Sequence, residues 1–141
     1  MLSPENSLKL TNWIGHASEA AGLAPEIALA LRGAVFEIRQ GYKSADSKRQ
    51  NADIGFGTHA LKEGYLPCVM VFSGQVSQTV VTRYKAQGLY VMLGSRNPLA
   101  HESTFDFFRN AVGWDLEEWM LTNQAALKTE IQSIVKHLLG R

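Results

Sequence analysis

The sequence predicts an α/β domain of three layers, with a central, mostly parallel sheet of three or more strands and helices on both faces. Strand and helix patterns alternate in the middle of the chain: strand patterns at 33–41, 66–72 and 89–93 are separated by helical patterns at 47–63 and 77–87. The second and third runs are continuously apolar, which is typical of strands covered by helices on both sides. This order favours right-handed crossovers and a parallel sheet.

Length and composition indicate one domain, residues 1–141, with 45% hydrophobic and 19% charged residues. Cys68 is the only cysteine and lies in an apolar run, so we expect a buried, inert thiol. The four histidines are too scattered in sequence to predict a metal site. The N-terminus lacks the pattern of a signal peptide, and no apolar run approaches the roughly 18 residues of a membrane span. We therefore expect a cytoplasmic protein that does not enter membranes.

Both ends of the chain are expected to be helical. Ser3, Pro4 and Glu5 form a helix start, namely a capping hydroxyl, a proline in the first turn and an acid. Pro25 begins a short second helix, apolar enough that we expect it to lie against the sheet.

The last third of the sequence contains two further helix signals. Ser103 or Thr104 begins a helix that carries three phenylalanines, expected in the core or in a subunit interface. Asp115 then caps a long final helix with acids in its first turn. Its apolar stripe consists of Leu116, Met120, Leu127, Ile131, Ile134, Val135 and Leu138.

Two glycines, Gly55 and Gly57, interrupt the helical pattern at 47–63. Glycine lowers helix stability, so we expect close packing of this helix on the sheet to account for them.

The first strand carries the main candidate site. Phe36 and Ile38 alternate with Glu37 and Arg39, which places the two charged side chains on one face, and Lys43 joins them if the strand runs that far.

The helix that follows this strand begins with two cations. Ser44 or Asp46 can cap it, and its first turn then holds Lys48 and Arg49. Cations at this end oppose the helix dipole, which indicates an anion-binding site. The alternative is a solvated sheet face on which Glu37 pairs with Arg39 or Lys43.

Polar or basic residues follow all three predicted strands. The three segments are Gly41-Tyr42-Lys43, Ser73-Gly74-Gln75 and Gly94-Ser95-Arg96. Ligands of parallel sheets usually bind beyond the carboxyl ends of the strands, so we place the candidate site at this edge.

Glu37-Ile38-Arg39 is comparable with the acid-x-lysine strand of metal-dependent nucleases. The longer string EIRQGYKSADSKRQNADI, followed by YLPCVMVFS and a further helix and strand, resembles the carboxyl-terminal part of type II restriction endonucleases. Within them it is most similar to the ApaLI-like group of the PD-(D/E)xK superfamily, as a truncated relative. The resemblance covers residues 36–95. It implies a restriction-endonuclease-like core with a mixed sheet, and a Mg²⁺-dependent endodeoxyribonuclease in which Glu37 binds the metal and Arg39 stands at the lysine position.

The chain departs from the family pattern in two ways. Arg39 cannot act as a base, so Lys43 or Lys48 would have to replace the lysine. The family has a second metal-binding acid on a strand that precedes the one with Glu37, and this chain has no such strand. Glu19, Glu26 or Asp53 would have to supply that acid, and Asp53 is the second metal-ligand candidate. A second subunit could also supply it. If the chain cleaves DNA, we expect Gln40 or Gln50 to orient water or phosphate.

We therefore expect a domain that binds double-stranded DNA as a homodimer and, if Glu37 holds Mg²⁺, cleaves it. The residues expected to contact DNA are Arg39, Lys43, Lys48, Arg49 and Gln50. Two alternatives stay open: a non-catalytic homo-oligomeric interaction protein that uses the aromatic segment 105–119, and a small-molecule binding domain at the strand ends.

Overall fold

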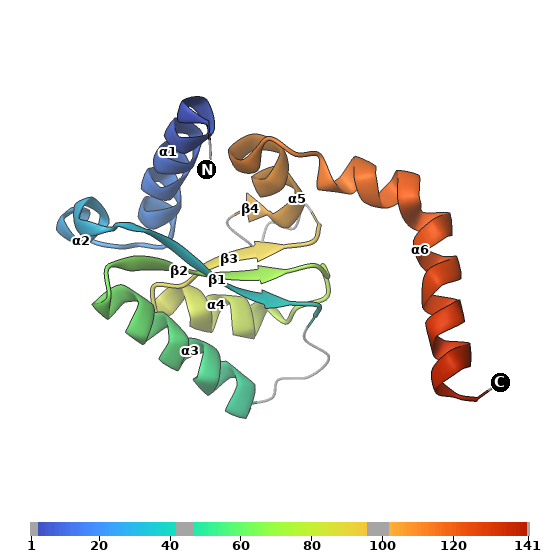
Figure 1. Ribbon diagram of the computed structural model, residues 1–141. Coiled ribbons are helices and arrows are strands. Elements are labelled where there is room, and N and C mark those ends of the chain that lie inside the picture. Colours follow the sequence, from blue (N-terminus) through green and yellow to red (C-terminus); the bar gives the residue numbers. More distant parts are fainter. Residues whose placement is uncertain (1–2, 42–46, 96–101, 141) are drawn as a thin grey trace.

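The structure, a computed structural model, describes residues 3–41, 47–95 and 102–140. These residues form an α/β fold in which a parallel sheet is flanked by helices (Figure 1). In chain order the elements are α1 (Pro4–Ala20), α2 (Pro25–Ala30), β1 (Gly33–Arg39), α3 (Ser47–Lys62), β2 (Tyr65–Val71), α4 (Gln78–Ala86), β3 (Tyr90–Leu93), β4 (Glu102–Ser103), α5 (Thr104–Phe107), a π-helical turn (Phe108–Val112) and α6 (Leu116–Leu138).

The sheet has the strand order β1-β2-β3-β4, and every pairing between its neighbours is parallel. Gly33 pairs with Tyr65 and Arg39 with Val71, so β1 and β2 begin and end together. The first three strands therefore reach the same edge with their carboxyl ends, as Figure 1 shows. The predicted fold class is confirmed, and the described sheet is wholly parallel rather than mixed.

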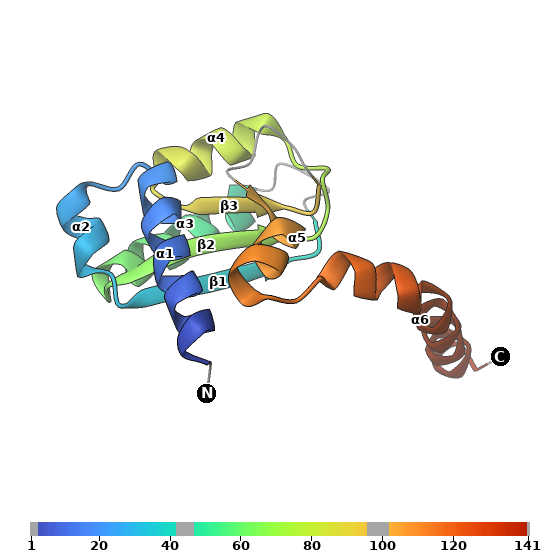
Figure 2. The ribbon, with the colours of Figure 1, turned by 90° about the horizontal axis from the view of Figure 1, so that it is seen from above.

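Two apolar clusters fill the spaces between the sheet and its helices. On one face, α1 and α5 cover β1–β3, and Trp13 packs against Phe36, Tyr90 and Phe107. On the other face, α3 and α4 cover the sheet (Figures 1 and 2). The residues buried there are Val69, Val71, Val80, Val81, Tyr84, Leu89, Val91 and Leu93.

Helix starts follow the sequence signals closely. The side chain of Ser3 accepts a hydrogen bond from the backbone N–H of Asn6, and that of Ser103 accepts from Phe105 and Asp106. Asp115 caps α6 by accepting from the N–H of Glu118. The proposed caps of α3, Ser44 and Asp46, lie outside the described residues.

The structure corrects the expected position of α2. This helix buries no residue, and Leu29 is 88% exposed, so the prediction that α2 lies against the sheet is wrong. The helix spans only Pro25–Ala30, less than two turns, and its apolar content cannot by itself decide where it packs.

The last third of the chain also differs in detail. A two-residue strand, β4, precedes α5, and the phenylalanine-rich helix widens into a π-helical turn before Gly113. Gly113 ends this turn with φ +82°, a left-handed conformation in which a side chain would be strained. Phe107 is buried in the core, as expected for at least part of this aromatic segment.

Helix α6 extends away from the α/β body, beyond the carboxyl ends of the strands (Figures 1 and 2). Leu116, in its first turn, is its one buried residue among those described. No helix in the described part of the chain is long and apolar enough to cross a membrane.

Candidate functional site

The expected site on β1 forms at the carboxyl edge of the sheet. Glu37 and Arg39 share the face that α3 covers, because their partners in the register are Val69 and Val71 of the cluster beneath α3 and α4. Nη2 of Arg39 lies 3.1 Å from Oε1 of Glu37. Alternation along the strand therefore brings the acid and the guanidinium together, as predicted.

Asp53 completes a charge network with this pair. It lies on the buried side of α3, fully shielded from solvent, and its Oδ1 accepts a hydrogen bond from Nη2 of Arg39 at 2.5 Å. Its Oδ2 accepts from the hydroxyl of Tyr84, on α4, at 2.6 Å. A buried carboxylate needs such donors, since an unpaired buried charge is very costly.

The guanidinium of Arg39 bridges the two carboxylates through one nitrogen, Nη2. A divalent cation held by Glu37 and Asp53 would need the space between them. Both carboxylate oxygens of Asp53 already accept hydrogen bonds, one from Arg39 and the other from Tyr84. Among the described residues, no group of three or more histidines, cysteines, aspartates or glutamates could hold a metal ion. In this arrangement Glu37 and Asp53 do not fit a Mg²⁺ site. The ion pair of Arg39 and Asp53 is better suited to holding α3 on the sheet.

The first turn of α3 presents two cations to solvent. Lys48 and Arg49 are both exposed on this turn, and α3 begins on the side of the sheet where the strands end (Figure 1). The first turn holds no acid, so the helix dipole and the two side chains favour an anion at this end. Lys43 lies outside the described residues.

Gln50 does not join this surface. It is buried, and its Oε1 accepts a hydrogen bond from Nη1 of Arg83 at 2.9 Å. Nη2 of Arg83 reaches Oδ1 of Asn51 at 2.8 Å, so one arginine of α4 holds the start of α3. Sequence patterns did not single out Arg83 or Tyr84, since their partners lie on a separate helix and no spacing rule joins them.

A second polar cluster lies on the opposite face of the sheet. Nε1 of Trp13 donates to Oε2 of Glu102 at 2.7 Å, and the hydroxyl of Tyr90 donates to the same oxygen at 3.2 Å. Burial, together with the charge of Glu102, raises the pKa of Tyr90. These contacts join α1, β3 and β4 within the aromatic core, which indicates a structural role.

Cys68 is fully buried in β2, and burial raises the pKa of its thiol. The expectation of an inert thiol is therefore supported, because the thiolate is the reactive form.

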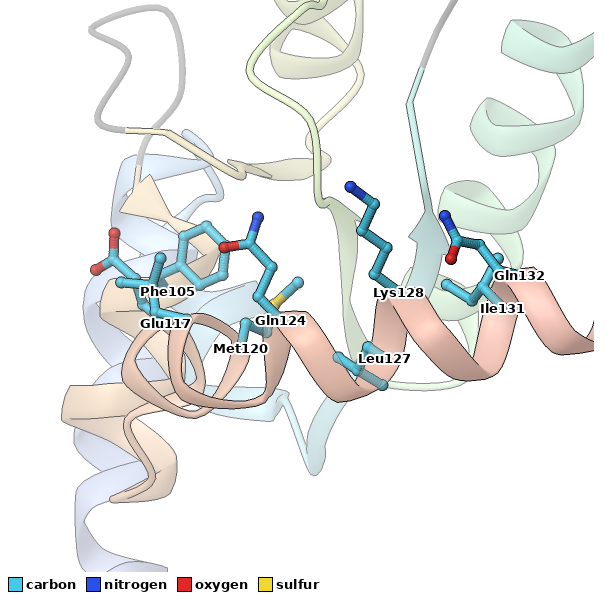
Figure 3. Close-up of a pocket in the computed structure, with 9 residues that line it drawn as sticks. Phe105, Glu117, Met120, Gln124, Leu127, Lys128, Ile131 and Gln132 are labelled. Atoms are coloured by element: carbon cyan, nitrogen blue, oxygen red, sulfur yellow. The ribbon is translucent and has the colours of Figure 1, made fainter.

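A groove of about 570 Å³ lies along α6 (Figure 3). Phe105 and one side of the helix form its walls, with Met120, Leu127 and Ile131 among the apolar residues and Glu117 and Lys128 among the charged ones. This groove was not predicted from the sequence, which placed the ligand at the strand ends.

The fold and the site thus define a parallel α/β domain with an internal charge network and a basic helix start at the carboxyl edge of its sheet. Comparisons with protein families, with curated proteins and with solved structures find no match.

Proposed function

We propose that this chain is a DNA-binding domain, built like the core of a restriction endonuclease, that contacts the phosphate backbone of double-stranded DNA as a homodimer. The observation that carries the proposal is the exposed pair Lys48 and Arg49 in the first turn of α3, at the carboxyl edge of a parallel sheet. Two neighbouring cations that oppose the helix dipole are stabilised when an anion binds beside them.

The division of roles on this edge supports backbone binding rather than catalysis. Arg39 has its charge offset by Glu37 and Asp53, so it attracts a phosphate less than an isolated arginine would. We assign contact with phosphates to Lys48 and Arg49, which are exposed. Lys43, which lies outside the described residues, stays an expected contact from the sequence. Cleavage with Mg²⁺ at Glu37 would require Arg39 to leave the space between the carboxylates. We therefore place DNA binding ahead of DNA cleavage.

The test of binding is the double variant Lys48→Glu/Arg49→Glu, assayed on a short DNA duplex over a range of salt concentrations. Binding by the wild type should weaken steeply between about 50 and 200 mM salt, since counterions are released from each contacted phosphate. The double variant should lose most of this binding. The slope of log affinity against log salt should fall by about 4 for a bound homodimer, since each of its two subunits loses two cations.

Glutamates are favourable at a helix N-terminus, so this double variant should fold at least as well as the wild type. A matched control is Lys62→Glu/Lys136→Glu, which makes the same charge change at two exposed positions away from the start of α3. Equal loss in the control, or unchanged binding in a folded Lys48→Glu/Arg49→Glu, would refute the assignment.

Cleavage is tested separately with supercoiled plasmid and Mg²⁺ or Mn²⁺, with EDTA and Glu37→Ala as controls. We expect retardation of the plasmid without nicking. Metal-dependent nicking that disappears in Glu37→Ala would instead assign the nuclease chemistry to β1.

A further inference from the structure

We infer that α6 is a self-association surface that pairs in parallel with α6 of a second copy of this chain. Met120, Gln124, Leu127, Ile131, Ile134 and Leu138 follow one another at intervals of four, three, four, three and four residues. This alternation is the a/d pattern of a two-stranded coiled coil, with Gln124, Ile131 and Leu138 at a and the other three at d. We call these six residues the α6 seam.

Most of the seam is exposed in the described part of the chain, and Leu127 is half-buried. Met120 is 40% exposed, Ile131 59%, Ile134 53% and Leu138 77%. Leu121 and Val135, at the flanking e positions, are also exposed and widen the apolar strip. A regular apolar strip on a helix that leaves the body is the arrangement expected of an interaction surface.

Gln124 identifies the partner as an identical helix. A single polar residue in an apolar seam must find a hydrogen-bonding partner once the seam is covered. In a parallel, in-register pair, Gln124 faces Gln124 of the second copy, and two amides can bond to each other. An antiparallel pair that matches the apolar layers would instead place Gln124 opposite Ile134.

Charges beside the seam favour the same orientation. Lys128 occupies an e position and Glu130 a g position. In the antiparallel pair, the lysines of the two copies would approach each other, and so would the glutamates, which is unfavourable. In the parallel pair, Lys128 lies next to Asn123 of the other helix and Glu130 next to Val135, so no like charges meet.

We expect the second helix to bind in the groove along α6. It is lined by Phe105 together with the seam residues Met120, Gln124, Leu127 and Ile131 (Figure 3). The seam spans slightly less than three heptads, which is short for an isolated coiled coil, and the groove adds contacts beyond the helix pair. Both α/β bodies would lie at the N-terminal ends of the paired helices.

This inference does not rest on DNA binding, and its test needs no DNA. Molar mass is measured by light scattering coupled to size exclusion, and by sedimentation, over a range of micromolar concentrations. The wild type should be a dimer, and Leu127→Asp/Ile134→Asp should weaken dimerisation at least about 30-fold. The matched control is Thr122→Asp/Thr129→Asp, which places the same two acids, seven residues apart, on the outer face of α6.

The control should remain a dimer, and so should Lys48→Glu/Arg49→Glu. A monomeric wild type, a dimer that survives the seam substitutions, or equal loss in both aspartate variants would overturn the inference. Orientation is tested by oxidising Gln124→Cys. A parallel pair should form a disulfide between copies, with Cys68 too deeply buried to interfere. Cross-linking that occurs only in a mixture of Gln124→Cys and Ile134→Cys would show an antiparallel pair and refute the proposed register.

Discussion

Arg39 of β1 and Asp53 of α3 form an ion pair, in which the carboxylate is fully buried and the arginine side chain is 25% exposed. The pair ties a helix to the edge strand of the sheet at the point where that strand ends. Tyr84 of α4 donates to the other oxygen of Asp53, so one carboxylate connects three elements of the fold. Breaking a buried pair is costly because the remaining charge has lost its partner.

The hydroxyl of Tyr84 should therefore contribute measurably to stability. Tyr84→Phe keeps the ring in the core but leaves Oδ2 of buried Asp53 without this donor, and we expect unfolding free energy to fall by about 1–3 kcal/mol. Urea unfolding followed by circular dichroism measures this loss. Tyr65→Phe is the control, because the partly exposed Tyr65 keeps its ring beneath Arg32 and should change stability by less than about 0.5 kcal/mol. Equal effects of the two substitutions would contradict the role given to Asp53.

Sequence alone placed Glu37 and Arg39 on one face, because that inference needs only the two-residue period of a strand. It could not place Arg39 between Glu37 and Asp53. That contact depends on how α3 is rotated over the sheet, and the rotation is set by packing between residues far apart in the chain. The same holds for Gln50, which was expected to face a ligand and instead faces Arg83.

The helical periodicity of apolar residues also identified apolar stripes, but it does not predict which element covers each stripe. The stripe of α6 was predicted, yet most of it is exposed, and the apolar α2 is exposed as well. A helical pattern states which residues share a face, whereas the element that packs on that face is a property of the tertiary structure or of a partner. The continuous runs of β2 and β3 were easier to interpret, because strands apolar on both sides require cover on both sides.

The two glycines of α3 should respond to substitution in opposite directions. A Cβ on Gly57 would lie 2.8 Å from Cδ1 of the fully buried Leu89, so Gly57→Ala should lower stability by about 1–3 kcal/mol through overpacking. A Cβ on Gly55 meets nothing within 4 Å, so Gly55→Ala should raise stability by about 0.5–1 kcal/mol through helix propensity. Thermal and urea unfolding of both variants measure the difference. A stabilised Gly57→Ala would mean that α3 does not pack closely on Leu89.

Arg109 and Asp115 give the start of α6 a dependence on pH. Nε of Arg109 donates to Oδ2 of Asp115 at 2.9 Å, and the N–H of Glu118 donates to its Oδ1. The hydrogen bond from Arg109, followed by that from Glu118, lowers the pKa of Asp115. A carboxyl group whose pKa is lowered by folding stabilises the folded state at pH values above its unfolded pKa of about 3.9. This stabilisation is lost as the pH falls through the lower pKa of the folded state.

The wild type should therefore lose stability in acid partly through this carboxylate. Asp115→Asn keeps an oxygen that can cap α6 but removes the charge, so the variant should be less stable at neutral pH, and the gap should close below about pH 4. Urea unfolding from neutral to acidic pH measures the gap, with the exposed Glu19→Gln as a control for general charge effects. A gap that stays constant across this range would show that the cap, and not the charged pair with Arg109, accounts for the contribution of Asp115.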